Sequence, residues 1–159
     1  MGEMNRFIFR AKGKNTKKWI YGAYLKMLPY TPAPIRNEDD VIPESDYKHL
    51  IITEGFSDWN MARGLQAFDI IPETVGQCTG LKDKNGNLIF EGDVLSDAGY
   101  KYIVEWSLKN GYFIRKPHIC ELFTYRIDEE TTRNLRIVGN IHDNPEYKIQ
   151  EVQYGLRND

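Results

Sequence analysis

The stretch Val75–Leu95, VGQCTGLKDKNGNLIFEGDVL, constrains the fold of this chain more than any other part of it. Its first half contains small residues, where a strand can bend or another backbone can approach closely. Asp83-Lys84-Asn85-Gly86 then predicts a tight turn. The aspartate can accept backbone N–H groups two residues ahead, while Asn85 and Gly86 tolerate positive φ. With a return strand at Leu88–Phe90, the stretch predicts a β-hairpin.

Two turn geometries fit this hairpin. One is a two-residue type I′ loop on Asn85-Gly86, and the other is a type I turn closed by Gly86 as a G1 bulge. An acidic residue at the first turn position and glycine at the fourth favour the second geometry. After the hairpin, Glu91-Gly92-Asp93 interrupts the strand pattern, which is how a small barrel turns a corner.

The rest of the chain predicts mainly β structure, without an internal repeat. Phe56–Gly64 fits either a short helix capped by Ser57 or a loop, and Asp128–Arg133 is predicted to be a charged loop. Asn144 as a side-chain cap, with Pro145 at the first helical position, predicts the start of a short C-terminal helix. Pro72–Thr74 suits a single helical turn. Strands are predicted at Arg6–Arg10, Trp19–Leu25, Lys48–Thr53, Leu65–Ile71, Tyr100–Ser107, Tyr112–Arg115, Ile119–Tyr125 and Leu135–Ile141.

Two separated signatures resemble the YopX family of bacteriophage and prophage proteins. They are TVGQCTGLKDKNGNLIFEGDVL at Thr74–Leu95 and IVGNIHDNPE at Ile137–Glu146. Arg10-Ala11-Lys12 and Trp19–Gly22 also match, so the resemblance covers residues 5–147. It implies a small β-rich phage protein with an SH3-like C-terminal part and a tendency to self-associate. It implies no catalytic residue. The chain departs from the family in its tail beyond Glu146 and in an insertion, SDWNMARG, at Ser57–Gly64.

The expected organisation therefore has an N-terminal subdomain of a β-hairpin and further strands at residues 1–74. A small SH3-like barrel at residues 75–147 and a tail at residues 148–159 follow it. The residues expected to shape turns and caps in the barrel part are Asp83, Asn85, Gly86, Gly92, Asp93, Asn144 and Pro145.

The charges along the chain are segregated, although the net charge is −2. Residues 1–30 hold seven Lys and Arg against one Glu, whereas residues 31–60 hold two against seven acids. The basic cluster fits a solvated hairpin tip, a phosphate-contacting patch or a docking site for the acidic segment of another subunit. We expect it to serve subunit contacts, and the competing possibility is that the acidic loop folds over it in the same chain. The cluster consists of Arg10, Lys12, Lys14, Lys17 and Lys18.

No motif in the sequence indicates catalysis, a cofactor or a metal. Cys78 and Cys120 lack metal-ligand spacing and, without an export signal, are expected to be reduced thiols. Asp93 is expected to accept backbone N–H bonds at the barrel corner, and Glu91 to be solvated. His49 has no cysteine or paired acid nearby in the sequence; His118 lies two residues before Cys120, and a zinc site would need two more nearby ligands.

The sequence therefore predicts a non-enzymatic phage protein in the cytoplasm of the bacterial host, acting through protein–protein contacts as a homo-oligomer. No apolar run approaches the ~20 residues of a membrane span. The alternative is a nucleic-acid-binding protein that uses the basic hairpin and the barrel aromatics as stacking platforms. The net negative charge of the barrel half is unfavourable for binding nucleic acid.

Overall fold

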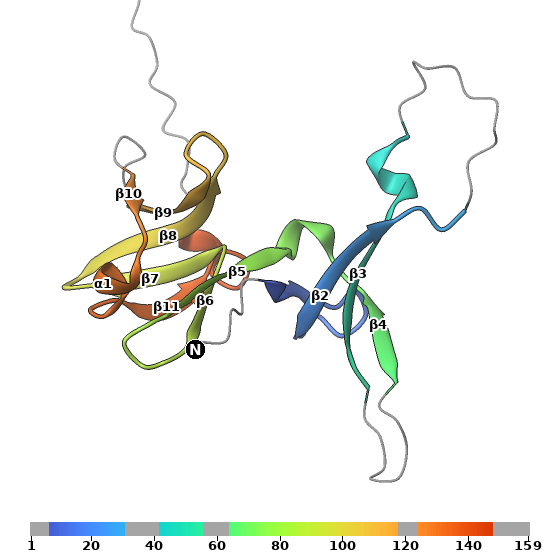
Figure 1. Cartoon of the computed structure of the whole chain (residues 1–159), viewed down its shortest axis with the longest axis horizontal. Helices are drawn as coiled ribbons and strands as arrows, with labels where there is room; N and C mark the ends of the chain where they lie inside the picture. Colours follow the sequence, from blue (N-terminus) through green and yellow to red (C-terminus); the bar gives the residue numbers. More distant parts are fainter. Residues whose placement is uncertain (1–6, 31–41, 56–63, 118–123, 148–159) are drawn as a thin grey trace, which may run out of the picture. The chain divides into compact units, whose positions relative to one another are not determined.

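The computed structural model describes residues 7–30, 42–55, 64–117 and 124–147, and most of its regular structure is β (Figure 1). Its strands are β1 (Phe9–Lys12), β2 (Trp19–Met27), β3 (Lys48–Glu54), β4 (Leu65–Asp69), β5 (Gly76–Lys82), β6 (Leu88–Phe90), β7 (Asp93–Asp97), β8 (Tyr100–Ser107), β9 (Tyr112–Pro117), β10 (Tyr125–Arg126) and β11 (Arg136–Asn140). Its helical segments are α1 (Glu129–Thr132) and the 3₁₀ turns η2 (Glu44–Asp46), η3 (Pro72–Thr74) and η4 (Pro145–Tyr147).

The mainly β prediction is confirmed, because the described residues form antiparallel sheets with one short α-helix. The chain divides into two compact units, Met1–Cys78 and Thr79–Asp159. It passes from the first unit to the second within β5, downstream of the boundary that the sequence predicts. No helix of the described residues is long and apolar enough to cross a membrane.

In the first unit, β2 is the central strand and has two partners. Its residues Trp19–Gly22 pair with β1, and Ala23–Met27 pair with β3. The strand changes partner at Gly22, where a Cβ atom would lie 2.1 Å from the carbonyl oxygen of Ile52. Only glycine permits this close approach of two backbones. β4 then pairs with β3, and β5 pairs with β1.

The sheet of the first unit curls so that the end of β4 meets the turn after β1. Gly13 forms an isolated bridge with Ile70, and the N–H of Ile71 donates to the carbonyl of Lys12 at 2.8 Å. Directly opposed residues of an antiparallel pair lie on one face. One face thus gathers the unit's core, which consists of Ala11, Ile51 and Ile70 with Phe9, Ile20, Tyr24 and Val75 packed against them.

In the second unit, the hairpin β5–β6 is closed by the turn at Asp83. The N–H of Gly86 donates to the carbonyl of Asp83 at 2.9 Å, and the N–H of Asp83 donates to the carbonyl of Asn87 at 2.8 Å. Gly86 has a φ of 85°, in the left-handed region. This is the type I turn with a glycine bulge, the second of the two geometries that the sequence allows.

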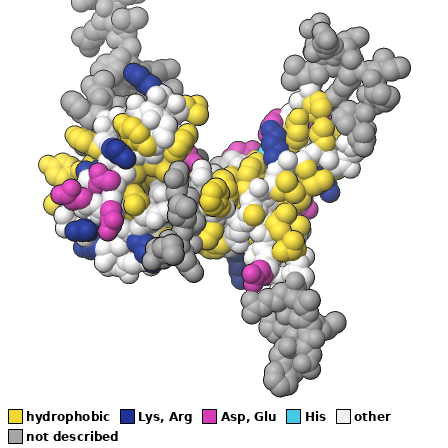
Figure 2. All heavy atoms as spheres, viewed as in Figure 1, with side chains coloured by type: hydrophobic (Ala, Val, Ile, Leu, Met, Phe, Trp, Pro, Cys, Tyr) yellow, Lys and Arg dark blue, Asp and Glu magenta, His cyan; other side chains and the backbone are white. Residues whose placement is uncertain are grey.

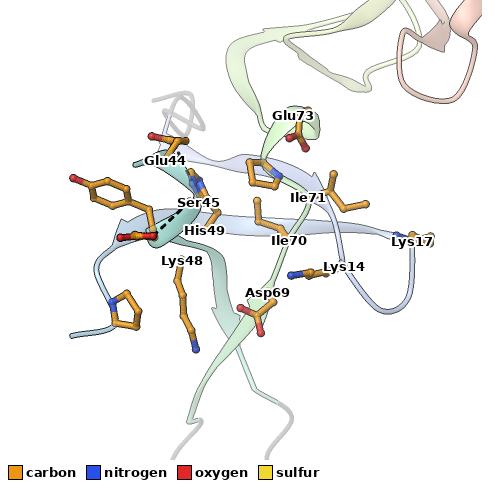
Figure 3. A pocket seen from close by; sticks show the side chains of 14 residues that line it. Lys14, Lys17, Glu44, Ser45, Lys48, His49, Asp69, Ile70, Ile71 and Glu73 are labelled. Carbon is orange, nitrogen blue, oxygen red and sulfur yellow. Dashed lines mark hydrogen bonds and ion pairs between the residues drawn. The ribbon is translucent and has the colours of Figure 1, made fainter. Parts of the chain in front are cut away.

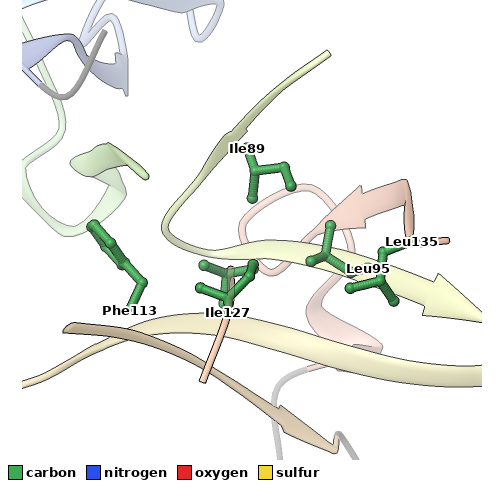
Figure 4. Close-up of a cluster of buried hydrophobic side chains, with 6 residues drawn as sticks. Ile89, Leu95, Phe113, Ile127 and Leu135 are labelled. Carbon is green, nitrogen blue, oxygen red and sulfur yellow. The ribbon is translucent and has the colours of Figure 1, made fainter. Parts of the chain in front are cut away.

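The remaining strands of the second unit form a sheet in the order β10-β9-β8-β7-β11. Trp106 packs against its core, and its ring meets that of Phe113 edge to face at 4.9 Å. A closed barrel is not found among the described residues, so the SH3-like barrel stays a prediction. The cluster of buried side chains is made of Ile89, Leu95, Val104, Phe113, Ile127 and Leu135 (Figure 4).

The prediction of a loop at Asp128–Arg133 was wrong, because α1 forms there. The Asp128 side chain accepts from the N–H of Thr131 at 2.9 Å, and the Thr131 hydroxyl accepts from the N–H of Asp128 at 3.1 Å. This reciprocal capping box satisfies N–H groups that a helix of one turn leaves unpaired. It has threonine where the usual pattern has glutamate, which is why the sequence pattern did not reveal it.

The C-terminal helix predicted after Asn144 is a single 3₁₀ turn, Pro145–Tyr147. Pro145 takes its first position, as expected. The Asn144 side chain, however, accepts from the N–H of Asn140 at 3.4 Å, and so it serves the preceding loop. The region Phe56–Gly64 falls outside the described residues except for Gly64, and the predicted strand Ile119–Tyr125 is described only at its end, where Tyr125 begins β10.

Candidate functional site

A hollow of about 790 Å³ opens on the first unit, and charged side chains surround it (Figure 3). Lys14 and Lys17, from the turn between β1 and β2, lie at one side of it. Glu44 and Asp46 of η2 line it as well, and both belong to the acidic stretch of the sequence. The basic turn and the end of the acidic segment therefore line the same hollow within one chain.

Two residues that line this hollow, His49 and Glu44, contact Tyr24 and Lys26 behind them. The Tyr24 hydroxyl lies 2.7 Å from Nδ1 of His49, with their rings stacked at 6.0 Å. Nε2 of His49 lies 3.3 Å from Oε1 of Glu44, although this approach is not aligned as a hydrogen bond. The other oxygen of Glu44 accepts from the ammonium of Lys26 at 2.6 Å. His49 is 8% exposed, so its ring is held between a phenol and a carboxylate.

Interactions within this cluster change the pKa values of Glu44, Lys26 and Tyr24. The hydrogen bond from Lys26 lowers the pKa of Glu44, and the same bond raises the pKa of Lys26. Burial is the main reason why the pKa of Tyr24 is raised, with Lys26 acting against it. The carboxylate and the ammonium therefore stay ionised together over a wide pH range.

The cluster consists of one phenol, one imidazole, one carboxylate and one ammonium, and it presents no further group for a reaction. Among residues 7–30, 42–55, 64–117 and 124–147, no group of three His, Cys, Asp or Glu side chains is placed to bind a metal ion. Two hydrogen bonds join its members, Tyr24 to His49 and Lys26 to Glu44, while the buried Nε2 of His49 has no hydrogen-bond partner among the described residues. The hollow is therefore a weaker candidate for function than the surface described below.

The five basic residues singled out in the sequence do not form one patch. The guanidinium of Arg10 lies 4.6 Å from the centre of the Trp19 ring, and the ammonium of Lys12 lies 5.5 Å from it. Arg10 is only 8% exposed. Lys14 and Lys17 line the hollow, and Lys18 is exposed beside them. The turn after β1 therefore separates Lys14 and Lys17 at the hollow from Arg10 and Lys12, which lie against Trp19.

The polar break after the hairpin is a structural corner. Gly92 has a φ of 82°, and Oδ2 of the buried Asp93 accepts from the N–H of Phe90 at 2.8 Å. Glu91 is not merely solvated, because its Oε1 accepts from the N–H of Trp106 at 3.2 Å. Both carboxylates thus hold backbone donors rather than a metal or a substrate.

The strongest candidate for a functional surface is the outer face of the sheet β2–β3–β4, opposite the core. The register places the residues listed below on one face. Tyr21 is 49% exposed, Met27 40%, Leu25 38% and Leu65 78%. Figure 2 shows hydrophobic side chains gathered over the region that these strands form. We call this surface the outer face; its apolar members are Tyr21, Ala23, Leu25, Met27, Leu50, Ile52, Leu65 and Ala67.

Sequence reasoning missed both the outer face and the cluster that His49 forms with Tyr24, Glu44 and Lys26. For the outer face a signal was present: β2 and β3 carry apolar residues at successive positions, which gives both faces of the sheet apolar side chains. For His49, its place two residues before the buried Ile51 indicates an inward side chain. Its contact with Glu44, from another element, has no signal in the local sequence.

Comparisons with known proteins agree on the fold and leave the activity open. The model of the YopX protein family matches residues 8–147 of this chain. The crystal structure of protein EF1440 from Enterococcus faecalis is similar, with a TM-score of 0.50 and 21% sequence identity, over 87% of this chain and 94% of that one. At this identity the likeness shows a shared fold. No curated protein matches the sequence.

Proposed function

This chain belongs to the YopX protein family, and from that premise we propose that it is a non-enzymatic phage or prophage accessory protein. In this proposal it works in the cytoplasm of the bacterial host through protein–protein contacts, as a homo-oligomer. Residues 1–74 carry the contacts, residues 75–147 form the SH3-like barrel, and residues 148–159 are a tail.

The exposed apolar outer face is the observation that carries this proposal. Large apolar side chains are exposed together on β2 and β4 rather than scattered singly. A contiguous patch of this kind on a soluble protein marks an interaction site, because its burial removes apolar surface from water. Tyr21 adds the kind of aromatic residue that protein interfaces favour.

The basic hairpin is a poorer contact surface than the outer face. Lys14 and Lys17 share their hollow with Glu44 and Asp46 of the same chain. Charges of opposite sign thus line one hollow within a single chain, which supports the intramolecular alternative. Surface charges of this kind also contribute little to stability once salt screens them.

Nucleic-acid binding is the second candidate, and the arrangement of aromatic rings gives it less support. Arg115 lies 4.7 Å from the centre of the Tyr102 ring and 5.4 Å from that of Tyr125. Arg126 lies 5.3 Å from the centre of the Tyr112 ring. Bases that stack on these rings have to displace the chain's own guanidinium groups.

The test is the molecular mass of the full chain in solution, measured by light scattering during size-exclusion chromatography. We expect a multiple of the 18.6 kDa chain mass for the wild type. Leu25→Lys, on the outer face, is expected to lower that mass toward the monomer. The matched control is Leu108→Lys, because Leu108 is 91% exposed on the turn between β8 and β9. A wild type that is monomeric at every concentration contradicts the proposal.

A further inference from the structure

β4 is the edge strand of the sheet in the first unit, and its outward edge has no strand partner among the described residues. All of its residues are exposed. An edge strand presents a row of unpaired N–H and C=O groups, which is a template for pairing with another chain. β4 thus offers backbone hydrogen bonds in addition to the apolar side chains of the outer face.

The hydrogen bonds around β4 show which of its groups point outward. The N–H of Ile70 donates to the carbonyl of His49 in β3 at 3.2 Å. Bonding to a neighbouring strand alternates along an antiparallel strand. Gln66 and Phe68 therefore bond to β3, and Leu65 and Ala67 direct their N–H and C=O groups away from it. The outward carbonyl of Asp69 agrees with this, because it accepts from the N–H of Lys14 at 2.9 Å.

The exposed part of this edge lacks the usual protection against pairing. Natural edge strands carry proline, lysine, inward-pointing charges or bulges that block a second strand. Leu65–Phe68 reads LQAF, without a proline or a charge, and its register with β3 is unbroken. The acidic Asp69 lies at the end of the strand, where the turn after β1 already occupies its carbonyl.

We propose that two copies of this chain pair antiparallel along β4, around a two-fold axis at Gln66. This inference rests on the proposed function as a homo-oligomer. Leu65 of one copy then faces Ala67 of the other, and each of these residues both donates and accepts a backbone hydrogen bond. The partner is a second copy because the outward groups are self-complementary about that axis.

Two further features suit a second copy. The uncharged segment Leu65–Phe68 meets itself without like charges opposite each other. Pairing at this edge also continues the sheet from one copy into the other, so that the two outer faces become one apolar surface. A dimer built this way presents a larger surface for further assembly than either chain does alone.

Amide hydrogen exchange at single residues tests this pairing on the full-length protein. The Phe68 N–H bonds to β3 and is expected to exchange slowly whether or not the chain associates. The Ala67 N–H points outward, so we expect it to exchange slowly in the oligomer and fast in protein diluted until it is monomeric. Phe68 thus serves as an internal control for the folding of the strand.

Ala67→Pro is the corresponding substitution, since it removes the outward N–H and leaves the bonds to β3 in place. We expect this variant to lose the subunit pair, with a mass reduced at least twofold. Ala67→Lys places like charges across the axis and is expected to weaken the pair most at low salt. Ala67→Lys keeps the test valid if the proline unfolds the strand, and circular dichroism detects such unfolding.

The possible outcomes separate the two proposals. An oligomer in which Ala67 exchanges fast while Phe68 stays protected, and whose mass Ala67→Lys leaves unchanged, overturns the β4 pairing but not the homo-oligomer. A wild type that is a monomer at every concentration overturns both. Slow exchange at Ala67 in the oligomer that is lost on dilution to the monomer supports both.

Discussion

The carboxylate of Asp83 accepts a hydrogen bond from the backbone N–H of Ile137 at 3.1 Å, across 54 positions of the chain. Its other oxygen accepts from the N–H groups of Asn85 and Asn87, each at 2.9 Å. Asp83 is 5% exposed. One buried side chain therefore closes the turn between β5 and β6 and fastens it to β11.

Asp83→Asn is expected to destabilise the protein by about 1 to 3 kcal/mol, because an amide cannot accept at both of its ends and leaves a buried N–H unpaired. The measurement is urea unfolding of both proteins. Asp97→Asn is the matched control at an exposed position of β7 and is expected to stay within about 0.5 kcal/mol of wild type. Equal losses in the two variants contradict the role given to Asp83.

The same carboxylate makes stability depend on pH in the acid range. Burial acts to raise the pKa of Asp83, but hydrogen bonds from Ile137, Asn87 and Asn85 outweigh it and the pKa is lowered. A lowered folded-state pKa stabilises the protein fully above the unfolded-state pKa of about 4, and this contribution is lost as the pH falls through the folded-state value.

Wild type is therefore expected to lose more stability than Asp83→Asn when the pH falls from about 6 to about 2.5. The measurement is the free energy of unfolding in urea at a series of pH values. Other carboxylates titrate in both proteins, so the difference between the two curves isolates Asp83. Parallel curves count against this account of its pKa.

Gly86 and Gly64 form a matched pair of glycines. A Cβ atom at either position meets nothing within 4 Å, but only Gly86 has a positive φ, of 85°. Gly86→Ala is expected to cost about 1 to 2 kcal/mol through left-handed strain. Gly64→Ala is expected to be neutral, or to stabilise by up to about 1 kcal/mol by restricting the unfolded chain. Similar urea midpoints for the two variants show that backbone strain does not govern the turn.

The two cysteines are expected to be thiols. Cys78 is fully buried in β5, and Cys120 lies outside the described residues. Freshly purified protein, unfolded without reductant, is expected to give two thiols per chain, with Cys78 unreactive until it unfolds. A count of zero points to a disulfide and to an oxidising compartment.

Local chemistry accounts for the parts of the fold that the sequence predicts well. The turn at Asp83 is determined by the side chains and backbone freedom of its own residues, Asp83, Asn85 and Gly86. It can therefore be predicted without knowing which other segments contact it. Pro72–Thr74 forms a helical turn for the same reason. The alternation of β8 predicts the strand but not its surroundings, since Ile103 and Val104 on opposite faces are both buried.

Tertiary contacts determine the features that the local sequence does not predict. Gly22 is required because β3 passes close to β2, and no local pattern reports the position of Ile52. The basic residues read as one cluster in sequence, yet β1 places Arg10 on Trp19 while the following turn carries Lys14 to the hollow. That β4 is an edge strand among the described residues depends on the order of strands in the sheet, which its own residues do not encode.

The most direct test of the account compares the masses in solution of two variants at low salt. One is Leu25→Lys on the outer face, and the other replaces Lys14, Lys17 and Lys18 by glutamate. If the outer face holds the subunits together, Leu25→Lys falls toward the 18.6 kDa monomer while the charge-reversed protein keeps the wild-type mass. The reverse result, an intact Leu25→Lys oligomer and a dissociated charge-reversed protein, contradicts the account and returns the contact to the basic hairpin.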